Sequence, residues 1–554
     1  MHVSVRWRGG TRGLTLVAVL ACAALGIPAV EGVPLVHGGK RCTGEPRAPG
    51  VGLPAIHLAE DASKGGVRRF VDADGRERVF HGVNAVVKGP PWRPSTDGFN
   101  VDSSLVDEDF ALLQKAGVTV IRLGLMWAGV EPTRGVYDAG YVSEMVALAR
   151  KAADYGIYTL LDMHQDVMSE KFCGEGFPAW AAQPSGSLAF PEPAGFAFTN
   201  DAKSGIPSAG DCEKHAWSQF YFSEAASTAF QALYDNKDGL LDSWAAMWAH
   251  VAGAFKGESH ILGAELINEP WAGDVIHRPT LLLPKIADLK NFQPAYDKLA
   301  AAIWAVDPER LVFFAGITWD DRGSGFTHAP GGAEVAARSV YCYHYYEYPS
   351  GPQVANTSAY HVTTQTAEAI RLGTGAMLTE FGEYGFMDDK GVFQAVTDSA
   401  DALLQSWTMW EYKKFCIPSD DPTQQNGKFG ACKTGYGGAL FSEDGTVKKE
   451  HLRGLARTYA QAVGGQFLMM RFHDTSGDFD LEFAPAPPCP ATAPPLDTRI
   501  FLSEAMNYAA GYTVAISPAG AATWARVGPD QVVITPTEAS AQASTPIRVS
   551  IRRQ

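Results

Sequence analysis

The sequence predicts an α/β fold in two parts, a (β/α)8 TIM barrel over residues 66–462 and a C-terminal β-sandwich over residues 465–554. In the first part, short β-rich apolar runs alternate with segments of helical length, which is the pattern of repeated βα units. In the second part, the runs are short and alternate in polarity between turn residues, as in a small sandwich. The 554 residues accommodate a barrel of roughly 250 to 400 residues plus a smaller domain.

Eight apolar runs are interpreted as the barrel strands. Eight parallel strands close a barrel. A doubly wound open sheet is the alternative, but no Gly-x-Gly-x-x-Gly motif follows the first run, which favours the barrel. The runs span residues 79–87, 118–127, 158–165, 261–268, 311–319, 339–346, 376–381 and 406–410. The predicted helices include residues 107–116, 141–155, 240–256, 292–306 and 398–405.

Residues 1–30 have the pattern of a secretory signal peptide, with three arginines, an apolar stretch of about a dozen residues and then small residues. Because a membrane-spanning helix needs about 20 apolar residues, a cleaved signal peptide is favoured over an anchor. Residues 31–65 are rich in Pro and Gly and are predicted to form an extended N-terminal arm. We therefore expect a secreted protein, either extracellular or lysosomal.

The chain is acidic. Its formal net charge is −15, and becomes −18 without residues 1–30, which contain three Arg and no acidic residue. Such a surface repels polyanions, so nucleic acid is not an expected partner. The C-terminal region shows no chemistry of its own and is predicted to be a structural packing partner of the barrel.

Eight cysteines are present, and seven remain once the signal peptide is removed, so at least one is unpaired. In an oxidising compartment we predict the disulfides Cys173–Cys212 and Cys416–Cys432, since each pair brackets a loop rich in Gly and Pro. Asn356 begins a possible glycosylation sequon, Asn-Thr-Ser.

A long insertion, about residues 169–238, separates the third and fourth runs and is rich in Phe and Trp. Long loops in compact domains are usually functional. These aromatic side chains either form a small satellite core held by the Cys173–Cys212 disulfide, or they form a lid that binds an apolar ligand. Both alternatives stay open at this point.

Two glutamates are candidates for the chemistry of glycoside hydrolysis. Glu269 follows the fourth predicted strand and Glu380 ends the seventh. The carboxyl ends of barrel strands form the catalytic face, so both carboxylates are expected there. Retaining hydrolysis needs an acid and a nucleophilic carboxylate about 5 Å apart.

Other polar or aromatic side chains stand near the same strand ends. They are Arg122, His164, His344, Tyr346 and Trp410. The period-two spacing of His344 and Tyr346 places them on one face of their strand. Each could be a buried structural residue, but their conjunction with two glutamates favours a catalytic site.

The segments Asn268-Glu269-Pro270 and Thr379-Glu380-Phe381-Gly382 resemble glycoside hydrolase family 5, whose members are retaining β/α barrels. The resemblance implies that Glu269 is the acid/base, that Glu380 is the nucleophile and that Asn268 donates to the sugar 2-hydroxyl. It further implies that Arg122 and Tyr346 keep Glu380 ionised, that His164 and His344 complete a polar floor, and that Trp410 stacks on the sugar.

A narrower resemblance is to the endoglycoceramidases, which cut the β-glycosidic bond between glycan and ceramide. It is carried by Gly82-Val83-Asn84 with Lys88, by residues 122–127, by residues 162–167 and by residues 176–181. The resemblance implies that Lys88 and Asp166 contact the sugar and the ceramide head, and that the substrate is a glycosphingolipid at a membrane or micelle surface.

The alternatives are another family 5 β-glycosidase, such as a glucosylceramidase, steryl-glucosidase or endoglucanase, and a non-catalytic glycolipid-binding protein. No cofactor is expected. Asp162, His164 and Asp166 alternate along one strand and could bind a divalent ion. We predict no metal, since the mechanism of this barrel needs none.

Overall fold

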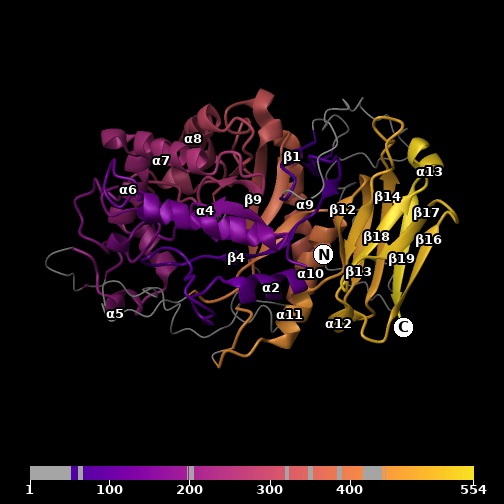
Figure 1. Ribbon diagram of the computed structural model, residues 1–554. Coiled ribbons are helices and arrows are strands. Elements are labelled where there is room, and N and C mark those ends of the chain that lie inside the picture. The colour runs from indigo at the N-terminus through magenta and orange to yellow at the C-terminus, as the bar shows by residue number, and fades with distance from the viewer. Residues whose placement is uncertain are drawn as a thin grey trace, which may run out of the picture. The chain divides into compact units, whose positions relative to one another are not determined.

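The computed structural model describes residues 52–59, 66–195, 198, 205–317, 323–346, 354–382, 390–415, 439–442 and 444–554. They form a barrel and, towards the C-terminus, two antiparallel sheets (Figure 1). The predicted signal peptide and the predicted Cys416–Cys432 disulfide lie outside the described residues.

Eight parallel strands close the barrel in the order β10-β11-β4-β5-β6-β7-β8-β9, which confirms the predicted fold class. Their residues are buried almost throughout, because helices cover the outside and side chains fill the inside. The strands are β4 (His81–Ala85), β5 (Val120–Gly124), β6 (Tyr158–Asp162), β7 (Ile261–Glu265), β8 (Val312–Phe314), β9 (Ser339–Tyr345), β10 (Gly375–Phe381) and β11 (Ser406–Met409).

The main helices of the barrel are α2 (Asp107–Lys115), α4 (Ala139–Asp154), α6 (Glu224–Tyr234), α7 (Leu240–Ala254), α8 (Gln293–Val306), α9 (Val354–Leu372) and α10 (Lys390–Ala402). Local capping sets some of their starts: the Asp138 side chain accepts a hydrogen bond from the backbone N–H of Tyr141 at 3.0 Å. The helix predicted at 398–405 is instead α10, which begins eight residues earlier and ends at Ala402. Helix α9 was not predicted, because its many Thr and Val residues have low helix propensity and its packing stabilises it instead.

Two sheets form the C-terminal sandwich. The seven-stranded sheet has the order β1-β2-β3-β12-β15-β18-β17 and the four-stranded sheet the order β13-β14-β19-β16. The C-terminal strands are β12 (Tyr459–Val463), β13 (Gly465–His473), β14 (Asp478–Pro485), β15 (Thr498–Phe501), β16 (Tyr512–Ser517), β17 (Ala522–Arg526), β18 (Gln531–Pro536) and β19 (Ile547–Arg553). A short helix, α11 (Lys449–Leu455), precedes them.

Three strands of the larger sheet come from the start of the chain: β1 (Ile56–Leu58), β2 (Phe70–Asp72) and β3 (Glu77–Arg78). β1 lies inside the predicted extended arm, and β12 begins before the predicted sandwich boundary at residue 465. The side chains of Ile56, Leu58 and Phe70 share a core cluster with interior residues of the barrel strands. The sandwich sheet and the barrel floor are therefore built partly from the same N-terminal segment.

The described part of the insertion between β6 and β7 contains α5 (Ala209–Cys212) and α6, and the predicted Cys173–Cys212 disulfide is present. Phe172, Phe177 and Phe220 are buried within the main barrel core. The structure thus favours a core over a lid for the described aromatic side chains, and Phe222 is the large exposed aromatic among them, at 50%. In the described part of the chain, no helix combines the length and the apolar character needed to cross a bilayer.

Candidate active site

Glu269 and Glu380 meet at the carboxyl ends of the barrel strands. Glu380 lies within β10, and Glu269 stands four residues after the end of β7, with its backbone at φ +41°. One carboxylate oxygen of each lies within 4.8 Å of the other and of a His344 ring nitrogen. Retaining glycosidases hold their carboxyl groups about 5 Å apart, whereas inverting enzymes need about 6.5 Å or more. The spacing therefore suits a retaining reaction.

His344 lies between the two glutamates. Its Nδ1 is 2.9 Å from Oε1 of Glu269 and 2.9 Å from Oε2 of Glu380. Burial alone would lower the pKa of His344, but the charges of Glu380 and Glu269 raise it to about 10. The two carboxylates therefore favour the protonated imidazole, and Nδ1 of His344 lies between them.

Arg122 on β5 is fully buried beneath the glutamates. Its guanidinium forms a two-bond fork with Glu265, with Nε–Oε2 at 2.8 Å and Nη2–Oε1 at 2.9 Å. A further contact, Nη1 to Oε1 of Glu380 at 3.2 Å, reaches the expected nucleophile. The other side chains within 3.0 Å of the guanidinium are Asn84, Asp162 and Asn268.

These cations control the ionisation of Glu380. Burial alone would raise the pKa of Glu380, but the charges of His344, Arg122 and His164 outweigh it and lower the pKa to about 2. Glu380 is thus an anion at neutral pH. The Glu269 side chain, at 15% exposure against 6% for Glu380, is more open to solvent, as suits a group that exchanges protons with water.

Asn268 and Gln165 fix the turn that carries Glu269. The Gln165 side-chain amide donates to the carbonyl oxygens of Asn268 and Glu269, both at 2.9 Å, and Asn268 Nδ2 donates to the carbonyl of Gln165 at 3.0 Å. Asn268 Oδ1 accepts from Arg122, so its amide group has a fixed orientation. Gln165 was not among the predicted site residues, because its side chain bonds to backbone carbonyl groups of the turn, and such contacts leave no pattern in the sequence.

A second charged cluster lies beside the first. Lys88 forms an ion pair with Asp166, and its Nζ is 3.7 Å from Glu175. His164 Nδ1 lies 2.7 Å from Asp162, and its Nε2 lies 3.7 Å from Asp166. Lys88, His164 and Asp166 were all predicted, and the structure brings them together.

Glu175 was missed by sequence reasoning, because it lies in the insertion, far from any strand end. Its backbone pairs with that of Asp166 through a short antiparallel bridge. Burial and the charge of Asp166 raise the pKa of Glu175 well above its usual value, although Lys88 opposes the shift. Its neighbour Cys173, in the disulfide with Cys212, and the adjacent Gly174 and Gly176 are the signals that this segment is tightly held.

The group His164, Asp166 and Glu175 has donor atoms close enough to hold a metal ion. Lys88 already places an ammonium group against the two carboxylates of this group. The cluster therefore contains a protein cation, and its donor set does not point to a metal.

Trp410 and Tyr346 border the site. The Trp410 ring stacks on His164 with centroids 5.4 Å apart, and Lys88 Nζ lies 4.8 Å from the Trp410 centroid. Tyr346 is partly buried and packs against the cluster of Val86, Met126 and Trp410. Its predicted hydrogen bond to Glu380, and the stacking of sugar on Trp410, stay predictions.

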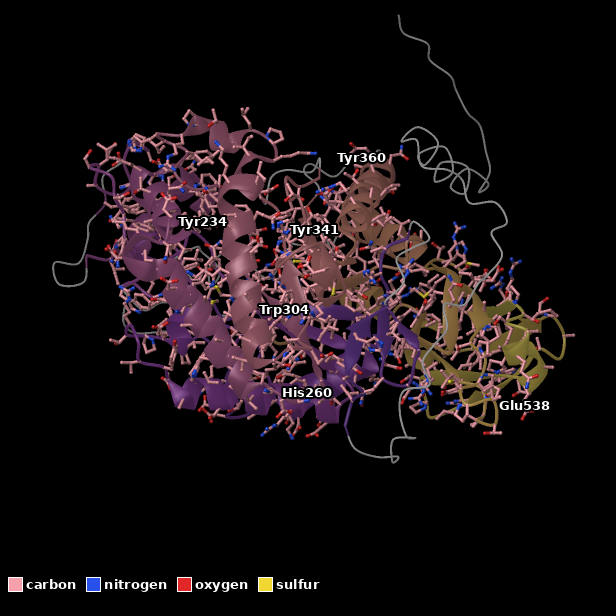
Figure 2. All side chains as sticks on the ribbon, turned by 90° about the horizontal axis from the view of Figure 1, so that it is seen from above. Tyr234, His260, Trp304, Tyr341, Tyr360 and Glu538 are labelled. Atoms are coloured by element: carbon pink, nitrogen blue, oxygen red, sulfur yellow. A yellow bond between two sulfur atoms is a disulfide. The ribbon has the colours of Figure 1, made fainter. Side chains whose placement is uncertain are left out.

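Glu265 and Asp162 are two further buried carboxylates. Neither was predicted as a catalytic or substrate-binding residue, and Asp162 was considered only as a possible metal ligand. Both end strands and both pair with Arg122. Each is an acidic residue within or at the end of an apolar run, and that position is the sequence signal that could have predicted it. A small cavity next to Glu269 is lined by residues including Gly316, Tyr341 (labelled in Figure 2) and His361.

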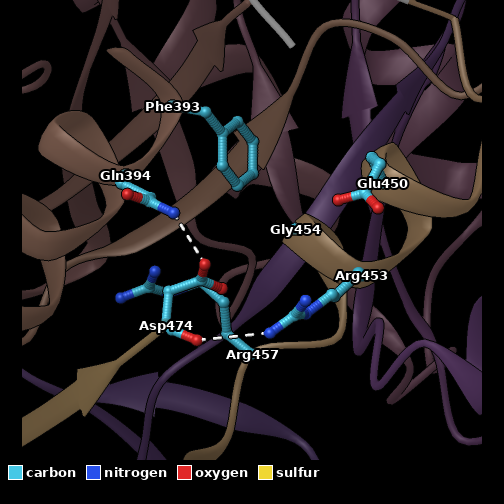
Figure 3. Close-up of a pocket in the computed structure, with 7 residues that line it drawn as sticks. All are labelled: Phe393, Gln394, Glu450, Arg453, Gly454, Arg457 and Asp474. Carbon is cyan, nitrogen blue, oxygen red and sulfur yellow. Dashed lines mark hydrogen bonds between the residues drawn. The ribbon is translucent and has the colours of Figure 1, made fainter. Parts of the chain in front are cut away.

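A different pocket lies between α10, α11 and the end of β13 (Figure 3). There Gln394 Nε2 donates to Asp474 Oδ2 at 2.6 Å, and Arg453 donates to the Asp474 carbonyl at 3.4 Å. Arg457 is paired with Asp398 and Asp401. These hydrogen bonds and ion pairs connect α10 and α11 with the residues that follow α11 and β13, at the junction of barrel and sandwich.

A closed parallel barrel with two close carboxylates at the carboxyl ends of its strands is the arrangement that retaining glycoside hydrolases use. Residues 71–415 match the family model described as cellulase (glycosyl hydrolase family 5), and residues 457–551 match the glycoside hydrolase family 5 C-terminal domain. The chain belongs to glycosyl hydrolase family 5 and is a glycosidase.

Relatives with assigned names are similar over most of the chain. An endoglycoceramidase of Cyanea nozakii is 40% identical over 462 residues, covering 83% of this chain and 88% of that protein. An endoglycoceramidase of Hydra vulgaris is 41% identical over 450 residues, covering 81% and 82%. The solved structure of endo-glycoceramidase II from Rhodococcus sp. has a TM-score of 0.66 at 22% identity, covering 87% of this chain and 99% of that chain. That structure has the same fold.

Proposed function

We propose that this protein hydrolyses the β-glycosidic bond between the glycan and the ceramide of glycosphingolipids, with retention of configuration. The spacing of Glu269 and Glu380, with carboxylate oxygens within 4.8 Å, is the observation that carries the chemistry. The substrate class is supported by the two relatives named endoglycoceramidase, at 40% and 41% identity.

In the first step, Glu380 attacks the anomeric carbon while Glu269 protonates the glycosidic oxygen, and ceramide leaves with that proton. The attacking carboxylate must be ionised, which the low pKa of Glu380 provides under the charges of His344 and Arg122. The product of this step is an ester between Glu380 and the glycan.

In the second step, Glu269 is a carboxylate and takes a proton from water, which attacks the anomeric carbon and releases the glycan from Glu380. His344 contacts both glutamates, so it can shift its hydrogen bond as the negative charge moves from Glu380 to Glu269. Asn268, oriented by Arg122, would donate to the sugar 2-hydroxyl.

Lys88, Asp166 and Trp410 would bind the sugar. Lys88 and Asp166 would supply a donor and an acceptor, and the Trp410 ring, which lies against Lys88, would supply an apolar face. None of these roles requires a cofactor.

The experiment is product analysis on a mixed glycosphingolipid pool in detergent micelles. Mass spectrometry should detect intact oligosaccharides together with ceramide, and NMR should show that the β-anomer is released first. Monosaccharide products from the non-reducing end would support instead another family 5 β-glycosidase. Binding without any product would support a non-catalytic glycolipid-binding protein.

We also propose that the protein is made in the secretory pathway and acts outside the cell or in the lysosome. The Cys173–Cys212 disulfide supports an oxidising compartment, and the exposed Asn356 on α9 gives its sequon access to glycosylation. Secretion of the full chain from cells, and a mass loss in Asn356→Gln equal to one N-glycan, would test both points.

A further inference from the structure

The loop between β7 and α8 has an unusual surface. Residues 277–290 expose three leucines, Leu282 at 37%, Leu283 at 57% and Leu289 at 46%. The same segment exposes the cations Arg278, Lys285 and Lys290. Its acidic residue, Asp288, is buried and accepts hydrogen bonds from the backbone of Ile317 and Gly325 at 2.9 and 2.7 Å. Arg278 lies 4.0 Å from Asp235, and the charged side chains that this fully described segment exposes are all basic, on a chain whose net charge is −15.

The exposed leucines are held in place. Leu281 is buried in the barrel core, and backbone bonds from Leu283 to Thr280 and from Leu289 to Lys285, at 3.1 and 3.2 Å, close turns on either side. We call Leu282, Leu283, Lys285, Leu289 and Lys290 the leucine–lysine patch. A folded loop that keeps several leucines in water is a common mark of a binding surface.

The patch belongs to the same loop as Glu269. His277 Nε2 lies 3.2 Å from Oε1 of Glu224 at the start of α6, next to the exposed Phe222. The Phe222 ring lies 5.0 Å from that of Trp271, two residues after Glu269. Tyr234 of α6, labelled in Figure 2, donates to the Trp271 carbonyl at 2.8 Å. The segment that carries the patch therefore contacts the start of α6 through His277, and the exposed Phe222 beside that contact packs on Trp271, two residues from the acid/base.

We propose that the leucine–lysine patch docks the enzyme onto the surface of an anionic lipid bilayer, with the leucines in the acyl boundary and the lysines among the headgroups. The inference rests on the proposed function, because ceramide is embedded in a bilayer and the enzyme must approach it there. Leucine side chains with flanking cations are what interfacial binding requires. An acidic protein would otherwise be repelled by an anionic membrane, so a local cationic surface determines which face approaches.

Two full-length variants separate the two components of docking. Leu282→Ser with Leu283→Ser removes apolar contact, and Lys285→Glu with Lys290→Glu reverses charge. The matched control is Trp524→Ser in β17 with Val527→Ser just after that strand, where the side chains are 44% and 52% exposed. Co-flotation with vesicles is measured for phosphatidylcholine alone and for phosphatidylcholine with phosphatidylserine, at low and high salt.

The serine variant should lose about tenfold or more in binding to the vesicles that bind the wild type. The glutamate variant should lose about tenfold or more on the phosphatidylserine vesicles, and the loss should shrink at high salt. The control should bind like the wild type. All three should hydrolyse a soluble aryl β-glycoside at the wild-type rate, which shows that they are folded.

Unchanged vesicle binding in both patch variants would overturn the inference, and so would an equal loss in the control. A change in oligomeric state without a change in vesicle binding would also overturn it, since the patch would then join copies of the chain. Flotation needs no turnover. If the wild type released no glycan from glycosphingolipid in detergent micelles, the proposed function would fail while the flotation result still decided the docking surface.

Discussion

Arg122 and Lys88 are two cations near the carboxyl ends of the barrel strands, and they differ in how far a ligand could reach their side chains. The Arg122 side chain has no exposed surface and is surrounded by five partner side chains, among them Glu265 and Glu380. The Lys88 side chain is 20% exposed, pairs with Asp166 and lies over the Trp410 ring. Arg122 therefore fixes the positions of Glu265 and Glu380, whereas Lys88 is accessible to a ligand. The comparison predicts different kinetic signatures for the two clusters.

The largest effect on activity is expected from substitution of Glu380, whose carboxylate contacts Arg122. Glu380→Gln keeps the shape of the side chain but removes the proposed nucleophile, so kcat on an aryl β-glycoside should fall by about 10⁴-fold or more. The control is a melting curve, which should show a folded protein. Hydrolysis at a wild-type rate would remove Glu380 from the mechanism.

Arg122→Lys should come next. Lysine cannot form the two-bond fork with Glu265 and reach Glu380 together, so kcat should fall by about 10² to 10³-fold with little change in KM. Breaking a buried ion cluster should also lower the free energy of unfolding by about 3 kcal/mol or more. Denaturant titration measures the second quantity. A variant that raised KM alone would mean that Arg122 contacts substrate, contrary to its burial.

Lys88→Met should have the opposite kinetic pattern. It removes the charged donor while keeping an apolar stem over Trp410, so KM for glycolipid should rise about tenfold and kcat should change little. Steady-state kinetics on one substrate in detergent micelles provide the measurement. A fall in kcat as large as that of Arg122→Lys would contradict the prediction that Lys88 affects mainly substrate binding.

The smallest effect is expected at Glu175 and depends on pH. The raised pKa of Glu175 in the folded state means that the acid is neutral at low pH and increasingly destabilising as pH rises above its unfolded value, near 4.5. Glu175→Gln should thus match the wild type in stability below about pH 4.5 and exceed it above, by up to about 1.4 kcal/mol per pH unit. Unfolding titrations at several pH values measure this difference, and one that stayed constant with pH would contradict the assignment.

The barrel could be predicted from the sequence because strands buried on both faces are continuous apolar runs. The location of Glu269, Glu380 and Arg122 could also be predicted, because the catalytic face of a barrel lies at the carboxyl ends of its strands. Glu175 and Gln165 could not. Glu175 reaches the site through a loop bridge to Asp166, and Gln165 through bonds to backbone atoms of Asn268 and Glu269. Such contacts depend on tertiary geometry and leave no periodic signal.

The role of the aromatic insertion could not be predicted from its composition. Its density of Phe and Trp is equally suited to a core or to a lid, and burial is a property of the folded chain that composition does not distinguish. The leucines at 282, 283 and 289 lie in a short loop of mixed composition, where no periodicity indicates which side chains face water.

Because β3 pairs with β12, the N-terminal part of the larger sheet cannot be completed until the ribosome has synthesised β12. Arg78 hydrogen-bonds to the carbonyl of Gln461, 383 residues later. At about 5 to 20 residues per second, the β2–β3 hairpin waits roughly 20 to 80 s for this partner to emerge from the ribosome. Throughout that interval its edge is open to pairing with a neighbouring chain, so the speed of translation and the crowding of ribosomes on one message should influence how much protein folds.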